Sequence, residues 1–208
     1  MCSAFAIVFF LTTSEGNASP SPSAIIRRAT QFLGERDLRR LEFVCCYGKC
    51  YESWAESLEK FPLLEELSIY LTDISKDGIK TAGRCCPMLT TLRINYEPVR
   101  YCDDEIAIAI GESLPELRHL ELIGACMSNI GLQVILDGCR HLESLDLCLC
   151  SFIDLKGEFG KKCIENIKCL KMPYDSLKGC PYICGSDPMA GPTAMISEMV
   201  EADYDDDL

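Results

Sequence analysis

The sequence is short of several residue types on which common functional sites depend. Only two of the 208 residues are histidine, His119 and His141, and they are not spaced as a ligand pair. Lys and Arg number 20 against 32 Asp and Glu, which gives a formal net charge of −12. Nucleic acids and anionic membranes bind basic patches, so this balance argues against both as partners. We therefore expect no metal site, no nucleic-acid partner and no membrane partner.

Long apolar runs and phosphate-binding glycine loops are also missing, and we expect no cofactor. The apolar run from Ala4 to Leu11 is too short to cross a bilayer. No basic residue precedes it and no convincing cleavage site follows, so it is a poor signal peptide. The alternative is a strand packed on the start of the fold.

Cysteine, by contrast, is abundant, with 15 residues. Disulfide-rich secreted domains are usually shorter and carry cysteine in loops, whereas many cysteines here lie inside apolar patterns. A buried free thiol behaves as a small hydrophobe. We expect a reducing compartment, the nucleus or cytoplasm, with secretion as the alternative. Cys180 and Cys184 have the spacing of half a zinc site, but no second half accompanies them.

One pattern, apolar-x-x-apolar-x-apolar, recurs along the chain at steps of 26, 25, 28, 25 and 25 residues. Its copies begin at Leu38, Leu64, Leu89, Leu117, Leu142 and, more weakly, Ile167. A period of this size is typical of leucine-rich repeats. Each copy predicts a short strand whose second and third apolar residues point into a core.

The segments between the copies repeat as well. Gly78 and Gly131 each lie eleven residues before a repeat leucine, and Ser75 and Ser128 precede them as suitable helix N-caps. Apolar residues then follow at helical spacing. We predict an α/β leucine-rich-repeat solenoid with a parallel sheet on the concave face and helices on the convex face. In this scheme the lone Trp54 is a core residue.

The paired cysteines of the stretch CCP also have a place in this repeat. Phe61, Cys86, Leu114 and Cys139 all stand three residues before a repeat leucine, and Cys163 is offset by one. Pro62, Pro87 and Pro115 follow this position, where a helix has to stop. We interpret these cysteines as packing residues rather than reactive groups.

Three parts of the chain are predicted. Residues 1–23 form an irregular N-terminal segment, 24–175 an array of five to six repeats, and 176–208 a C-terminal wrap with a disordered acidic tail. The last eleven residues hold six carboxylates and no base. Such a tail is either a solvated end or a docking segment for a basic partner.

The repeat has the form I-S-x-x-G-I-x-x-A-G-x-x-C-P-x-L-x-x-L-x-I, and the phrases LRRLEFVCCYGKCYESW, EKFPLLEELSI and CPMLTTLRI accompany it. Together they resemble the cysteine-containing leucine-rich repeats of plant F-box/LRR-repeat proteins, over about residues 24–175. The resemblance implies a non-catalytic substrate receptor of an SCF-type ubiquitin ligase, which docks on a Skp-type adaptor and a cullin through an F-box and holds a target for degradation.

Residues 1–37 are too short for an F-box and contain no Leu-Pro pair. Two readings stay open: a receptor or its repeat fragment, or a stand-alone scaffold, secreted in one version, with no link to ubiquitin. In both, the chain is not an enzyme. A nucleophile made of Cys148 and His119 on adjacent strands lacks any base-orienting partner in the sequence.

A target protein would bind the outward side chains of the concave face. These alternate with the buried ones along each strand. They form a mixed surface of acids, bases and a few aromatics, which suits protein recognition. The predicted binding residues are Arg40, Glu42, Glu66, Tyr70, Arg93, Asn95, His119, Glu121 and Asp146.

Overall fold

The structure is a computed structural model, and it describes residues 4–10, 38–45, 55, 57–70, 74–96 and 103–177. The chain divides into two compact units, Met1–Leu177 and Lys178–Leu208, and every described residue belongs to the first. The predictions for Trp54, for Cys180 and Cys184, and for the acidic tail lie outside the described residues.

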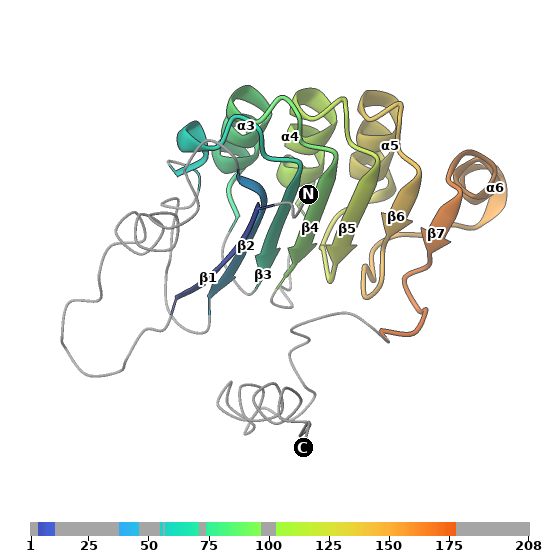
Figure 1. Ribbon diagram of the computed structural model, residues 1–208. Coiled ribbons are helices and arrows are strands. Elements are labelled where there is room, and N and C mark those ends of the chain that lie inside the picture. The colour runs from blue at the N-terminus through green and yellow to red at the C-terminus, as the bar shows by residue number, and fades with distance from the viewer. Residues whose placement is uncertain are drawn as a thin grey trace, which may run out of the picture. The chain divides into compact units, whose positions relative to one another are not determined.

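A parallel sheet of seven strands forms the centre of the described part of the chain (Figure 1). The strands hydrogen-bond in sequence order, each to the one before and the one after. Their bounds are β1 Ala4–Phe10, β2 Leu38–Cys45, β3 Glu66–Tyr70, β4 Thr91–Asn95, β5 His119–Ile123, β6 Ser144–Asp146 and β7 Cys169–Lys171. The predicted α/β fold with a parallel sheet is therefore confirmed.

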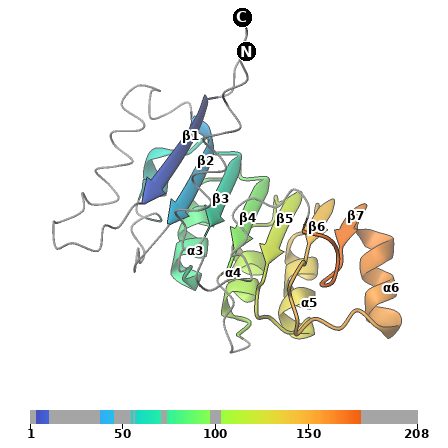
Figure 2. The same cartoon turned by 90° about the horizontal axis from the view of Figure 1, so that it is seen from below.

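Helices connect the strands from β2 onward and lie on one face of the sheet (Figures 1 and 2). They are the short 3-10 helix η1 Leu58–Lys60, then α3 Lys76–Cys85, α4 Glu105–Ser113, α5 Asn129–Gly138 and α6 Gly157–Asn166. Within the described ranges, none of the helices is both long and apolar enough to pass through a membrane. The opposite face of the sheet carries no described helix.

Strand β1 falls in the segment that was expected to be irregular. It pairs in parallel with β2, from Ala4 opposite Leu38 to Phe10 opposite Cys45. The apolar run that weakly resembled a signal peptide thus extends the sheet by one strand. The physical reason is that β2 would otherwise present a row of unpaired backbone groups at the edge.

The repeat leucines pair in register across the sheet and build the core. Leu67 lies opposite Leu92, which lies opposite Leu120, and Leu120 lies opposite Leu145. All four are fully buried. Since neither a strand nor its helix can bury an apolar side alone, this stacking supplies the hydrophobic stabilisation of each unit.

Two predicted N-caps are confirmed. The Ser75 hydroxyl accepts a hydrogen bond from the Gly78 N–H, and the Ser128 hydroxyl accepts one from the Ile130 N–H, each at 3.1 Å. Ser128 is also held by the preceding unit, because the Asp104 carboxylate accepts its backbone N–H at 2.7 Å and its hydroxyl at 2.6 Å. This bidentate contact fixes the start of α5 against the start of α4.

The cysteines of the helix-to-strand turns are confirmed as packing residues. Cys86 and Cys139 are buried, and the Cys139 thiol donates to the Leu114 carbonyl oxygen at 3.3 Å. Burial raises the pKa of both thiols to about 12. Thiolates are the reactive form, so these cysteines are inert near neutral pH.

Glycines let the C-terminal ends of α4 and α5 approach each other closely. A Cβ added at Gly138 would overlap the backbone carbonyl of Gly111, and one at Gly111 would overlap the carbonyl of Val134. Any side chain at these positions would force the two helices apart.

Candidate protein-binding face

The strand register places the outward side chains of the helix-free face in three rows across the sheet. The first row runs from Arg40 through Glu66 to His119, and the second from Glu42 through Arg93 to Glu121 and Asp146. The third row lies at the carboxyl ends of the strands. Successive residues of a strand point to opposite faces, so all three rows share one face.

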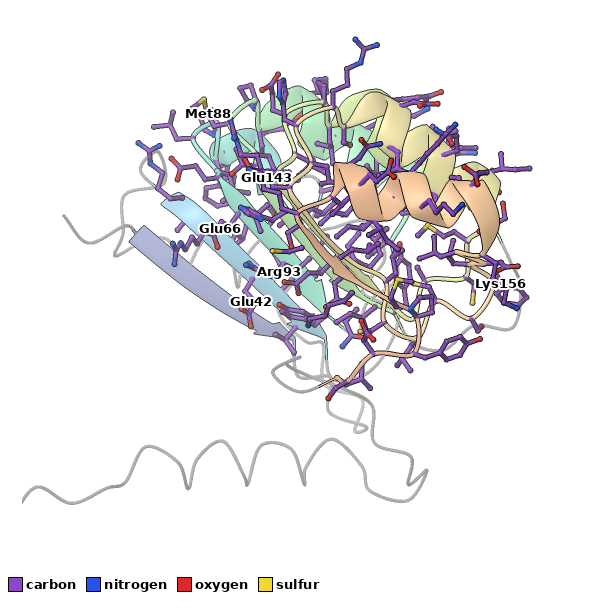
Figure 3. All side chains as sticks on the ribbon, turned by 90° about the vertical axis from the view of Figure 1, so that its right-hand side faces the viewer. Glu42, Glu66, Met88, Arg93, Glu143 and Lys156 are labelled. Carbon is purple, nitrogen blue, oxygen red and sulfur yellow. The ribbon has the colours of Figure 1, made fainter. Side chains whose placement is uncertain are left out.

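Four charged residues of alternating sign form a connected ladder over β2 to β5. Glu66 accepts from Arg40 at 2.9 Å and from Arg93 at 3.4 Å. Arg93 in turn donates through Nε to Glu121 at 3.1 Å. Figure 3 shows Glu42, Glu66 and Arg93 gathered on this face. We call Arg40, Glu66, Arg93 and Glu121 the charge ladder.

Arg93 is the centre of the ladder. Burial acts to lower its pKa, but the negative charge and hydrogen bond of Glu121 and the hydrogen bond of Glu66 outweigh that effect and raise it. The guanidinium therefore keeps its charge at any physiological pH. A planar guanidinium held between two carboxylates offers a pre-organised donor surface of the kind often found at binding hot spots.

Six of the nine predicted binding residues are at least partly accessible: Arg40, Glu42, Glu66, Arg93, His119 and Glu121. All six lie in the first two rows. The structure brings them together as predicted, although whether a target contacts them stays a prediction.

The other three, Tyr70, Asn95 and Asp146, are buried rather than solvated. Asp146 accepts the Cys148 backbone N–H at 3.0 Å and the Lys171 ammonium at 2.7 Å, so it fixes the end of β6. Tyr70 has a raised pKa, chiefly because burial disfavours the phenolate.

Burial extends along the whole third row: Val44, Tyr70, Asn95, Ile123 and Cys148. The connection after a neighbouring strand covers at least one of them, because the Cys148 thiol lies 3.8 Å from the Asp175 carbonyl oxygen. Strand alternation identified the face correctly, but it could not show that this end of it is buried.

His119 and Cys148 are not a catalytic pair. His119 lies opposite Ser144 in the sheet, and Cys148 is four residues farther along. At about 3.3 Å per residue, this separates them by roughly 13 Å. Among the described residues, no group of three or more His, Cys, Asp or Glu side chains is arranged to hold a metal ion.

Sequence reasoning missed an exposed apolar group in the connections after β6 and β7. Leu149 and Phe152 are each 48% exposed and Tyr174 is 88% exposed. Leu149 also has φ of 62°, in the left-handed region that leucine avoids. Alignment of the repeats could have revealed Leu149, because Gly124, with φ of 73°, occupies the equivalent position in the preceding unit.

Known proteins with similar sequences are named for F-boxes and leucine-rich repeats. F-box/LRR-repeat protein 23 of Arabidopsis thaliana is 44% identical over 144 residues, which are 67% of this chain and 32% of that protein. F-box protein SKIP19 of the same plant is 38% identical over 141 residues, 68% of this chain and 46% of its own length.

The chain resembles plant F-box/LRR-repeat proteins. F-box/LRR-repeat protein 21 of Arabidopsis thaliana extends the likeness to 171 residues, at 37% identity, covering 73% of this chain and 55% of that protein. The chain thus spans between about a third and about half the length of these curated F-box/LRR relatives. No protein-family model matches it.

Proposed function

We propose that the chain is a target-binding module of an SCF-type ubiquitin ligase receptor, and that its repeats form a leucine-rich-repeat solenoid with the helix-free face on the concave side. The observation that carries the proposal is the in-register polar face, with its charge ladder over β2 to β5. The names of the F-box/LRR relatives add the link to ubiquitination.

In this role the chain makes and breaks no bonds. It holds a target protein close to a ubiquitin-conjugating enzyme, and proximity raises the local concentration of acceptor lysines. The charge ladder selects targets, because a partner has to match the alternating signs of Arg40, Glu66, Arg93 and Glu121 to replace their mutual ion pairs. A Skp-type adaptor and a cullin are the further partners that this role requires.

The nucleus or cytoplasm is the compartment that we propose. The buried thiols of Cys86, Cys139 and Cys150 support it, since none of the three forms a disulfide. Titration of thiols in denatured, unreduced chain from its native source tests this. Several disulfides would contradict it.

The decisive experiment is affinity purification of the tagged full chain from plant cells, with the Skp adaptor, the cullin and other captured proteins scored by mass spectrometry. Two charge-reversal variants separate specific from general effects. Arg93→Glu breaks the ladder, whereas Arg84→Glu removes an exposed α3 arginine that pairs with Glu59.

We expect the adaptor to co-purify with all three proteins, docked by a surface other than a standard F-box, and the targets to be lost only from Arg93→Glu. Circular dichroism and melting temperature check that this variant folds. Capture of proteins without adaptor or cullin would leave a binding scaffold outside the ligase and refute the proposal. Equal capture by both variants would refute the ladder as the binding surface.

A further inference from the structure

The exposed apolar side chains of Leu149, Phe152 and Tyr174 lie in two adjacent connections at the carboxyl ends of β6 and β7. The Leu149 N–H donates to the Pro173 carbonyl oxygen at 2.9 Å, which joins the two connections. We call these three residues the C-edge patch. Binding residues lie on loops held by a rigid scaffold more often than on the elements that the loops connect.

Leu149 is kept where glycine would fit better. Its φ of 62° lies in the left-handed region, which costs a leucine conformational strain, and the equivalent residue of the preceding unit is Gly124. The side chain does not recover this cost by burial, since it is 48% exposed. An exposed apolar side chain on a strained backbone is the kind of outlier that functional loops retain.

The charges around the patch define the chemistry of a partner. The described connections after β6 and β7, which carry the patch, hold two carboxylates, Asp154 and Asp175, against one ammonium, Lys156. Asp154 and Asp175 flank the patch in sequence and are exposed. Two exposed carboxylates beside apolar side chains complement a basic segment with an apolar anchor.

We propose that the C-edge patch binds a short segment of the target protein in which a large apolar side chain stands next to lysine or arginine. This rests on the proposed function, since it names a second part of the chain, beside the charge ladder, that contacts the target. Tyr174, the most exposed of the three, supplies the broad contact typical of a hot spot. The carboxylates hold the flanking cations.

A displayed library of random twelve-residue peptides, selected on the full chain, tests the proposal. We expect enriched peptides to combine Phe, Leu or Trp with neighbouring Lys or Arg. Fluorescence anisotropy then measures one enriched peptide and its charge-reversed version, in which Glu replaces each base. The reversed peptide should bind at least ten-fold more weakly, and added salt should weaken the original.

Matched variants locate the site. The double variant Phe152→Ser with Tyr174→Ser should weaken the peptide at least ten-fold. The control variants Met88→Ser and Ile164→Ser remove exposed apolar side chains from the turn before β4 and from α6, at 49% and 58% exposure, and should change affinity less than two-fold. Leu149→Gly keeps the loop backbone and should weaken binding about three-fold.

The inference is overturned by no enriched peptide, by enrichment without a basic preference, or by equal weakening by the control variants. Self-association that the double variant abolishes would show that a second copy occupies the patch and would overturn it too. The proposed function fails separately. If the adaptor and cullin fail to co-purify while the peptide still binds, only the proposed function is refuted. Normal target capture by the double variant refutes only the patch.

Discussion

The edge of the sheet at the amino ends of the strands and the edge at their carboxyl ends differ in the contacts that their side chains make. At the edge where helices lead into strands, charges pair between neighbouring units. Arg39 binds Glu65, and Glu143 accepts from both Arg118 and Lys168. Hydrogen bonds from Lys168 and Arg118 lower the pKa of Glu143. Buried turn cysteines and proline stops complete this edge.

At the opposite edge, where strands lead into helices, three described residues have a strained backbone or an exposed apolar side chain. Leu149 is strained, and Phe152 and Tyr174 are exposed. Figure 3 shows Met88, from the first edge, and Lys156, from the second, at opposite sides of the molecule. Contacts between units occur at both edges, since Asp104 binds Ser128 at the second, but the second edge adds a group of three exposed apolar side chains that is available for recognition.

The largest expected effect is on the close approach of α4 and α5 beside the first edge. Gly138→Ala places a Cβ against the Gly111 carbonyl and should lower the free energy of unfolding by about 3 kcal/mol. Gly157→Ala, at φ of 70° with open space around it, should cost about 1 kcal/mol through strain. Urea unfolding followed by circular dichroism measures both. Equal midpoints for the two variants would contradict the packing argument.

The second effect is a loss of stability in alkali. Cys86 and Cys139 ionise near pH 9 when exposed, but burial raises their pKa to about 12 in the folded chain. Between these values the unfolded chain binds fewer protons, so the stability that is complete below pH 9 falls as pH rises. Each thiol should contribute a loss of about 1 kcal/mol between pH 9 and pH 10.

The double variant Cys86→Ala with Cys139→Ala is the control for that prediction. It is less stable at pH 7.5, because the sulfur atoms leave cavities, but its stability should depend less steeply on pH. Parallel pH slopes for the variant and the native chain would show that other groups cause the alkaline loss.

The smallest effect concerns the backbone of the second edge. At most positions alanine is more stable than glycine, but at φ of 62° the order should reverse. Leu149→Gly should therefore be about 1 kcal/mol more stable than Leu149→Ala, as judged by thermal unfolding. If alanine is the better residue, Leu149 is not strained, and the contrast between the edges weakens.

Much of the fold could be predicted from the sequence, because the repeat leucines impose one register on every unit. The N-caps Ser75 and Ser128 and the buried Cys86 and Cys139 followed from the same period. The strand β1 was harder to predict, since an apolar run of that length fits a strand and a signal core equally well.

The candidate site was only partly predictable. Alternation along the strands found the polar face, but Tyr70 and Asn95 proved buried. Burial at the end of a strand is not determined by the alternation along that strand. Leu149 was also not predicted, because composition and spacing say almost nothing about the backbone angle of a single loop residue.

The strand order has a consequence for how such a chain can change in length. Each described strand hydrogen-bonds only to its neighbours in sequence order, which lie about 34 residues away between β1 and β2 and about 25 to 28 residues away between the others. Gain or loss of one unit at an end therefore leaves the hydrogen bonding between the remaining strands as it was. A recognition surface built this way can be lengthened or shortened by whole units without a new fold.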